Sequence, residues 1–266
     1  MTLAHTVIGQ AADLLHDAQT HRVPISPLTE RYPGLTVAHA YGIQQVNLTR
    51  RLRAGRTLVG NKIGLTSEPM QTLLGVDEPD FGYILDDMVL PPGGTVAASR
   101  FCAPRVEPEV AFLLRSPLRG PGVTVEDVGA ATEAVAVALE VVDSRIADWK
   151  LTLPDTVADN ASSGAVVLGD WVPYGDGLDL PTARASLWLN GTEIDSGLGS
   201  AVLGDPAVAV AWLANALAPF GTAILPGQFV LSGSFTTAAF VHSGDQASTT
   251  ISGLGTVSLQ FTEEKP

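Results

Sequence analysis

Apolar residues in the first part of the chain recur at the spacing of amphipathic helices. Between residues 3 and 18 they fall every three or four positions, which places them on one face of a helix. After a Pro-rich loop over residues 22–35, a second helix is expected from Thr36, a suitable N-cap, to Arg53, ending near Gly55. The N-terminal quarter is therefore predicted to be helical.

Beyond residue 57 the pattern changes to short apolar runs separated by Gly, Pro and Asn, which is typical of strands. Asn190-Gly191 lies between two such runs and is a strong signal for a β-hairpin. Asp205-Pro206 is typical of a helix start. The expected strands are 58–65, 105–114, 135–142, 186–190, 192–194 and several within 224–261; the expected helices are 67–74, 125–133 and 205–217, with loops over 76–95.

Predicted helices and strands are thus largely segregated along the chain. This favours an α+β fold over a doubly wound parallel sheet. We divide the sequence into a helical N-terminal portion, residues 1–57, and a β-rich portion, residues 58–266, which carries the candidate chemistry. The sequence contains no Gly-rich phosphate loop in a strand-to-helix context.

Composition and charge exclude several classes of protein. The 266 residues are 45% hydrophobic and 16% charged, which is typical of a globular chain. A net charge of −13 repels phosphate backbones and anionic lipid, so neither nucleic acid nor membrane is expected as a partner. Cys102 is the single cysteine, so an internal disulfide or a cysteine zinc site is excluded. Without an uninterrupted apolar run of about 18 residues, we expect a cytoplasmic protein.

Two glutamates lie two residues apart in the predicted strand 105–114. Glu107 and Glu109 therefore point to the same face of that strand. Pro108 between them must occupy a position where the strand needs no donor, such as an edge or a bulge. Taken alone, the pair is equally well interpreted as a solvated strand face, because charged groups are mostly exposed.

Glu140 changes this interpretation, because it interrupts the apolar run 135–142 that is expected to be buried on both faces. A buried carboxylate must be protonated, paired with a cation such as Arg145, or bound to a metal. Three adjacent carboxylates repel one another, and a divalent cation removes that conflict. Oxygen ligands suit Mg²⁺ or Mn²⁺, and a shell with open positions is a catalytic arrangement.

Five segments stand in an order that resembles a known family. They are Gly60-Asn-Lys-Ile-Gly-Leu-Thr-Ser67, Gly75-Val-Asp-Glu-Pro-Asp-Phe-Gly82, Arg105-Val-Glu-Pro-Glu-Val-Ala-Phe112, Leu139-Glu-Val-Val-Asp-Ser-Arg-Ile-Ala-Asp-Trp149 and Asp155-Thr-Val-Ala-Asp-Asn-Ala-Ser-Ser-Gly164. The chain resembles the 2-oxopent-4-enoate hydratase (2-hydroxypentadienoate hydratase) family and its relative 4-oxalocrotonate decarboxylase, both in the fumarylacetoacetate hydrolase superfamily. The resemblance covers nearly the whole chain.

The resemblance implies a mixed, roll-like or barrel-like β core with a helical N-terminal portion, in a homo-oligomer. It implies Mg²⁺ or Mn²⁺ bound by a Glu-x-Glu pair and one later Glu, which here are Glu107, Glu109 and Glu140. It also implies catalytic roles for Lys62, in the Lys-Ile-Gly-Leu-Thr segment, and for Asp80, in the Asp-Phe-Gly segment. It implies a pocket-lining role for Ser162, in the Asp-Asn-Ala-Ser-Ser segment. Without the resemblance, Lys62 would be interpreted as a surface lysine and Asp80 as a turn residue.

The resemblance further implies metal-dependent hydration of a 2-hydroxy-2,4-dienoate to a 4-hydroxy-2-oxo acid, in catabolism of aromatic or related rings. Lys62 and Asp80 would move protons or position the water, without a division of roles between them. The alternatives are decarboxylation of 4-oxalocrotonate, carbon–carbon hydrolysis of an acylpyruvate, and a non-catalytic cation site that only staples the fold. Because Arg105 and Arg145 are also placed to neutralise the glutamates, we expect a substrate with one carboxylate and an apolar tail.

Overall fold

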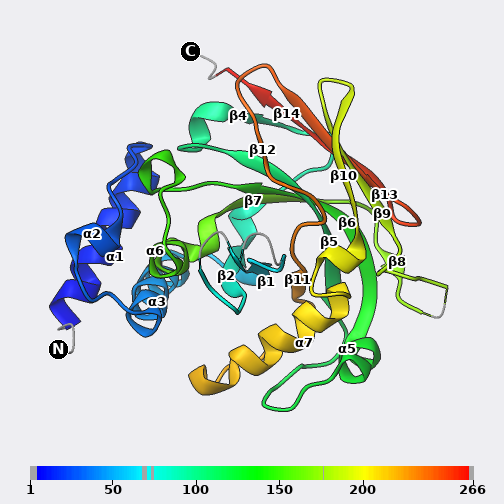
Figure 1. The fold of residues 1–266 in the computed structure, drawn as a ribbon, viewed down its shortest axis with the longest axis horizontal. Helices are drawn as coiled ribbons and strands as arrows, with labels where there is room; N and C mark the ends of the chain where they lie inside the picture. The colour runs from blue at the N-terminus through cyan, green and yellow to red at the C-terminus, as the bar shows by residue number, and fades with distance from the viewer. Residues whose placement is uncertain (1–4, 68–70, 73–74, 176, 264–266) are drawn as a thin grey trace.

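Two mixed β-sheets form the centre of the molecule (Figure 1). The computed structural model describes residues 5–67, 71–72, 75–175 and 177–263, and within them the larger sheet has nine strands and the smaller has five. The larger sheet runs in the order β2 (Asp80–Leu85), β1 (Leu58–Gly64), β11 (Phe229–Leu231), β5 (Arg105–Leu114), β6 (Thr132–Val142), β7 (Ser163–Leu168) and β3 (Val89–Leu90), with β12 (Ala239–Phe240) on β5 and β8 (Val172–Pro173) on β6.

The smaller sheet runs in the order β10 (Thr192–Leu198), β9 (Arg184–Leu189), β13 (Gln246–Ile251), β14 (Gly255–Thr262) and β4 (Thr95–Ala97). The β1–β11, β3–β7 and β14–β4 pairs are parallel, while the long β5–β6 pair is antiparallel. The expected α+β class with a mixed, roll-like core is therefore confirmed.

The helices lie in two groups outside the sheets (Figure 1). The first group is α1 (His5–His21), α2 (Leu28–Arg31), α3 (Val37–Arg53) and α6 (Leu153–Ala158); the second is α5 (Val125–Ala131) and α7 (Pro206–Ala216). Short 3-10 turns are η1 (Asp86–Met88), η2 (Ala98–Arg100), η3 (Ala147–Trp149), η4 (Asn160–Ser162), η5 (Gly199–Ala201) and η6 (Ala218–Phe220). As expected, Thr36 and Asp205 cap α3 and α7, because their side chains accept hydrogen bonds from His39 N and Ala207 N.

One continuous buried cluster joins the N-terminal helices to the sheets. It contains Leu28 and Ile43 from the helical portion and Val110 and Leu139 from the strands. The division after residue 57 therefore remains a proposal about organisation along the chain, since both portions share this core.

The segment Gly199–Phe220 has the length and mean hydropathy (1.5) of a membrane-spanning helix. However, α7 covers only 11 of these residues, whereas a span needs about 20. Its side chains at Val210 and Leu213 are fully buried in the protein core. The helical part of this apolar segment, α7, is therefore a core helix.

The loop expected over residues 76–95 is wrong in part, because β2, η1 and β3 lie within it. All six residues of β2 are buried, so no alternation of polar and apolar residues marks the strand. The helix after Thr124 ends at Ala131 rather than at residue 133, because Thr132 already begins β6. The short helix expected over residues 67–74 falls largely outside the described residues.

Candidate metal centre and active site

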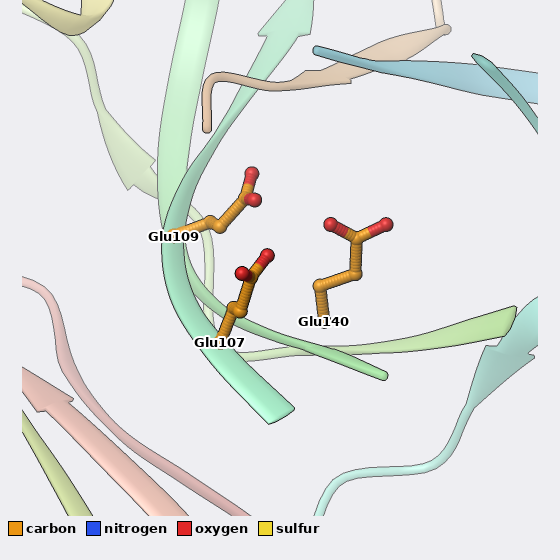
Figure 2. Close-up of side chains that lie close together, drawn as sticks. All are labelled: Glu107, Glu109 and Glu140. Atoms are coloured by element: carbon orange, nitrogen blue, oxygen red, sulfur yellow. The ribbon is translucent and has the colours of Figure 1, made fainter. Parts of the chain in front are cut away.

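The antiparallel register of β5 and β6 brings three glutamates together. Glu107 lies directly opposite Glu140, and Glu109 lies on the same face of β5, two residues further along. Figure 2 shows all three side chains reaching into one space, with Glu140 facing the other two. One carboxylate oxygen from each residue lies within 4.8 Å of the others.

Pro108 lies on β5 between the stretch that pairs with β12 and the stretch that pairs with β11. Its carbonyl accepts a hydrogen bond from Phe235 N (3.0 Å), and the carbonyl of Val110 accepts one from Ser232 N (3.0 Å). This edge of β5 therefore faces the segment 232–235, which lies between the stretches paired to β11 and β12. Because the proline nitrogen points to this side, β5 keeps its pairing with β6 at the glutamates.

Three of the six carboxylate oxygens at this site are buried and have no hydrogen-bond partner among the described residues. Glu109 and Glu140 are only 1% and 0% exposed, whereas Glu107 is half-buried. Glu109 Oε2 accepts a hydrogen bond from Gly233 N (2.8 Å). Glu109 Oε1 and both oxygens of Glu140 have no hydrogen-bond partner among the described residues. The Lys62 ammonium lies 3.3 Å from Glu140 Oε2, but one cation does not balance three carboxylates. Buried carboxylates with so few donors are costly, so these converging oxygens fit a divalent cation such as Mg²⁺ or Mn²⁺.

The electrostatics of the three glutamates indicate the same conflict. The pKa of Glu107 is raised to about 7, mainly by burial; Lys62 opposes this rise, and the carboxylate of Glu140 adds to it. Burial, followed by Glu140, also raises the pKa of Glu109 well above its usual range. Three ionised carboxylates are therefore unfavourable here without an added cation.

Lys62 lies on β1 and is buried at 3% exposure, so it is not a surface lysine. Its Nζ donates a hydrogen bond to the carbonyl of Ala161 (3.0 Å) and lies 3.3 Å from Oε2 of Glu140. Burial alone lowers the pKa of Lys62, but the four surrounding carboxylates, led by Glu140, raise it above its ordinary value. Lys62 is therefore a charged ammonium beside the glutamates.

Glu140 is thus paired with Lys62, and Arg145, its candidate partner in the sequence, lies elsewhere. Arg145 is buried and pairs with Asp159, with 2.5 Å between Nε and Oδ1. The sequence could not distinguish these partners, because Lys62 and Glu140 are 78 residues apart in the numbering (140 − 62).

Asp80 begins β2 and lies opposite Gly64 in the β1–β2 ladder. It is 1% exposed; its Oδ2 accepts a hydrogen bond from Thr156 Oγ1 (3.1 Å), and its Oδ1 has no partner among the described residues. A Cβ at Gly64 would lie 2.3 Å from Asp80 Oδ1 and 3.5 Å from Lys62 Nζ, so glycine is required there. Burial raises the pKa of Asp80, and Lys62 opposes that rise.

Ser162 ends the turn η4, in which three consecutive non-glycine residues are left-handed. Asn160, Ala161 and Ser162 have φ values of 56°, 50° and 52°. Ser162 is 4% exposed, and its Oγ has no partner in the part of the chain that the structure describes. Each left-handed residue costs roughly 1–2 kcal/mol, so the surroundings must hold this turn. The Ala161 carbonyl that contacts Lys62 was not found from sequence, because a backbone acceptor carries no residue-type signal.

The strain at Ala161 predicts an unusually small effect of glycine. Ala161→Gly removes a buried methyl group but also the left-handed penalty, so the free energy of unfolding should change by less than about 0.5 kcal/mol. The matched control is Ala165→Gly on β7, a buried position without positive φ, which should destabilise by about 1–2 kcal/mol. Urea unfolding of both variants measures the difference, and equal losses would contradict strain at Ala161.

Comparisons with known proteins agree with this architecture. Residues 49–262 match the family described as fumarylacetoacetate (FAA) hydrolase C-terminal. The chain is 47% identical over 251 residues to the 2-hydroxyhexa-2,4-dienoate hydratase of Comamonas testosteroni, covering 94% of this chain and 95% of that protein. It is 48% identical over 219 residues to the 2-hydroxypent-2,4-dienoate hydratase of Pseudomonas putida, covering 82% and 99%.

A solved structure also superposes over nearly the full length. The 4-oxalocrotonate decarboxylase from Pseudomonas putida G7, complexed with magnesium and adipate, matches with a TM-score of 0.94 at 36% identity, covering 98% of this chain and 99% of that one. Sequence and structure together show that this chain belongs to the fumarylacetoacetate hydrolase family, within its branch of 2-hydroxydienoate hydratases and 4-oxalocrotonate decarboxylase.

Proposed function

We propose that this protein hydrates 2-hydroxy-2,4-dienoates to 4-hydroxy-2-oxo acids, in the catabolism of aromatic or related rings. The observation that carries the proposal is the convergence of Glu107, Glu109 and Glu140 beside buried Lys62 and Asp80. The relatives named above as hydratases support the reaction, and the magnesium of the decarboxylase structure supports a divalent metal. Mg²⁺ or Mn²⁺ suits three carboxylate ligands.

The proposed reaction moves protons twice. The 2-hydroxy-2,4-dienoate first becomes a 2-oxo-3-enoate, as the 2-hydroxyl proton leaves and a proton is added at C5. Water then adds across the remaining double bond, with its oxygen at C4 and a proton at C3. The divalent ion, when bound, supplies positive charge that favours an anionic carboxylate and 2-oxygen.

The buried side chains around the glutamates supply the proton transfers. Lys62 is a charged donor, and Asp80 has an unpartnered oxygen and a raised pKa, so we assign these two residues jointly to moving protons and positioning water. The Ser162 hydroxyl, also buried and unpartnered, is assigned to substrate binding. We further propose a cytoplasmic homo-oligomer with neither nucleic acid nor membrane as partner, consistent with the net charge of −13.

An ultraviolet assay with 2-hydroxypenta-2,4-dienoate, with and without Mg²⁺ or Mn²⁺, tests the reaction. Loss of dienol absorbance only with metal, and a product one water heavier, are expected. A product that has lost carbon dioxide from the six-carbon diacid would identify a decarboxylase. Pyruvate released from an acylpyruvate would identify a hydrolase. If metal raises the melting temperature but no substrate is turned over, the cation site only stabilises the fold.

One observation favours the decarboxylase alternative, whose substrate carries a second carboxylate. Arg105 lies on the same face of β5 as Glu107, and its Nε has no hydrogen-bond partner among the described residues. Its guanidinium lies 4.2 Å from the ring centroid of Trp149 and 4.1 Å from that of Phe240. Because Arg145 is already paired with Asp159, Arg105 is the arginine of the quoted segments that remains for a distal carboxylate.

Competition between substrates measures whether the site recognises tail charge. At saturating Mg²⁺, we expect the five-carbon monoacid to be used with a higher kcat/KM than the six-carbon diacid. The reason is that aromatic rings cover Arg105 and the protein is strongly acidic, so a second buried carboxylate would be poorly compensated. Preference for the diacid with release of carbon dioxide would replace the hydratase by the decarboxylase. Equal use of both would show that tail charge is not recognised.

A further inference from the structure

We propose that the buried Arg145–Asp159 pair positions Lys62 by locking the left-handed turn η4. The inference rests on the proposed function, because it assigns a positioning role to residues that do not themselves reach the three glutamates. It also explains why a charged pair is kept in the interior. A buried ion pair is often no more stabilising than apolar side chains of similar volume, so its geometry is the more informative property.

Arg145 bonds the chain on both sides of the turn. Its backbone N–H and its Nε donate to the two carboxylate oxygens of Asp159, at 2.9 and 2.5 Å. Its Nη2 donates to the carbonyl of Asp159, just before the turn, and its Nη1 donates to the carbonyl of Ser163, just after it, at 2.9 Å. The planar guanidinium therefore fixes the distance between the two ends of η4.

Two further contacts hold the turn between those ends. The side chain of Asn160 accepts a hydrogen bond from Tyr83 N (2.8 Å) and donates one to Tyr83 O (3.0 Å), which ties the turn to β2. The carbonyl of Ser162 accepts from Asp143 N at 2.7 Å. Three successive left-handed non-glycine residues do not persist unless surrounding contacts impose them, and these contacts supply that constraint.

The turn reaches Lys62 through one carbonyl. Ala161 O accepts from Lys62 Nζ at 3.0 Å, and Glu140 Oε2 lies 3.3 Å from the same nitrogen. An ammonium has three donors, so these two oxygens largely define its direction. The side-chain hydrogen bonds of Arg145 end at Asp159 and Ser163, and its Nη1 also lies 3.8 Å from Oδ2 of Asp143, whose N–H bonds the carbonyl of Ser162. All of these contacts flank η4, so the turn is the route from Arg145 to Lys62.

The test compares Arg145→Lys and Asp159→Asn with a matched control, Asp155→Asn. Asp155 is an equally buried carboxylate four residues before Asp159, and its oxygens accept from Thr29 on α2 and from Thr152 at the start of α6. We expect kcat to fall roughly 10- to 100-fold in the two test variants, with KM and Mg²⁺ affinity within about threefold. Asp155→Asn should lower the melting temperature comparably and leave kcat within about threefold.

A second measurement does not depend on turnover. Acetylation by acetic anhydride, mapped by mass spectrometry, reports the accessibility of Lys62, with exposed Lys150 as internal reference. Lys62 should react about tenfold faster in Arg145→Lys and Asp159→Asn than in the protein without substitutions or in Asp155→Asn. If neither test variant folds, Asn160→Gly tests whether η4 holds Lys62, because it removes the contacts to Tyr83 while glycine tolerates the positive φ. Unchanged Lys62 labelling in that variant would also overturn the proposal.

The two readouts separate this inference from the proposed function. Faster labelling of Lys62 together with a lower kcat supports the positioning role. Unchanged labelling, or faster labelling with unchanged kcat, would overturn it. If the protein without substitutions hydrates no dienoate, the hydratase proposal fails. The labelling rates alone then decide whether Arg145 and Asp159 hold Lys62 in place.

Discussion

Glu107→Gln, Glu109→Gln and Glu140→Gln should each weaken binding of Mg²⁺ or Mn²⁺ about 100-fold. Glutamine keeps the shape of the side chain but loses its charge, and a charged contact of this kind is worth about 3 kcal/mol. With metal at a fixed millimolar concentration, kcat/KM should fall by a factor of roughly 100–1,000, since charge stabilisation of the reacting oxygens is lost. Isothermal titration with each metal and steady-state kinetics measure the two effects.

The metal-free melting temperature should not fall in Glu107→Gln and Glu109→Gln, although both variants lose metal affinity. Burial and neighbouring carboxylates raise the pKa values of Glu107 and Glu109, so neutral glutamine should leave the metal-free melting temperature unchanged or higher. Glu140→Gln differs because it also removes the partner 3.3 Å from Lys62, and no gain is expected there. In all three variants the increase in melting temperature on adding metal should be lost.

The matched control for the metal shell is Glu133→Gln. Glu133 lies on β6, as Glu140 does, but it is exposed and not part of the cluster. Its replacement should leave metal affinity and kcat/KM within about twofold, because exposed charges far from the site contribute little. Full activity in any two of the glutamate-cluster variants would end the assignment of these residues as metal ligands.

The candidate glutamates could be predicted from sequence because strand periodicity is a local property. Two residues two apart on a strand must share a face, and a carboxylate within an apolar run must be compensated. The register that places Glu140 opposite Glu107 is not a local property, because it depends on the turn and helix between β5 and β6. The sequence therefore indicated which residues to combine but not how closely they lie.

Other parts of the site carried no local signal. β2 has buried residues on both faces and no alternation, so its start at Asp80 was missed, and Asp80 was selected only through the family resemblance. The pairing of Lys62 with Glu140 depends on strands that are distant in sequence. The three left-handed residues of η4 are ordinary Asn, Ala and Ser, and their conformation is imposed by Arg145, Asp143 and Tyr83.

Lys62→Met should lower kcat by a factor of roughly 100–10,000, the usual range for loss of a proton-transfer group. Methionine approximates the length of lysine and suits a buried site, but it removes the charge and all three donors. Metal affinity should change by less than about tenfold, since the three glutamates remain and a repelling cation is lost. Single-turnover kinetics at saturating metal, together with metal titration, separate these effects.

The control for this substitution is Lys150→Met, because Lys150 is exposed, with 70% of its side chain accessible, and pairs with exposed Asp148. It should leave kcat, metal affinity and melting temperature nearly unchanged. Lys62→Met also leaves Glu140 without its cation, so the metal-free protein should be destabilised and bound metal should restore much of that loss. Normal kcat in Lys62→Met would show that the buried ammonium only compensates the glutamates. A large loss of kcat with retained metal binding would place Lys62 in the proton transfers.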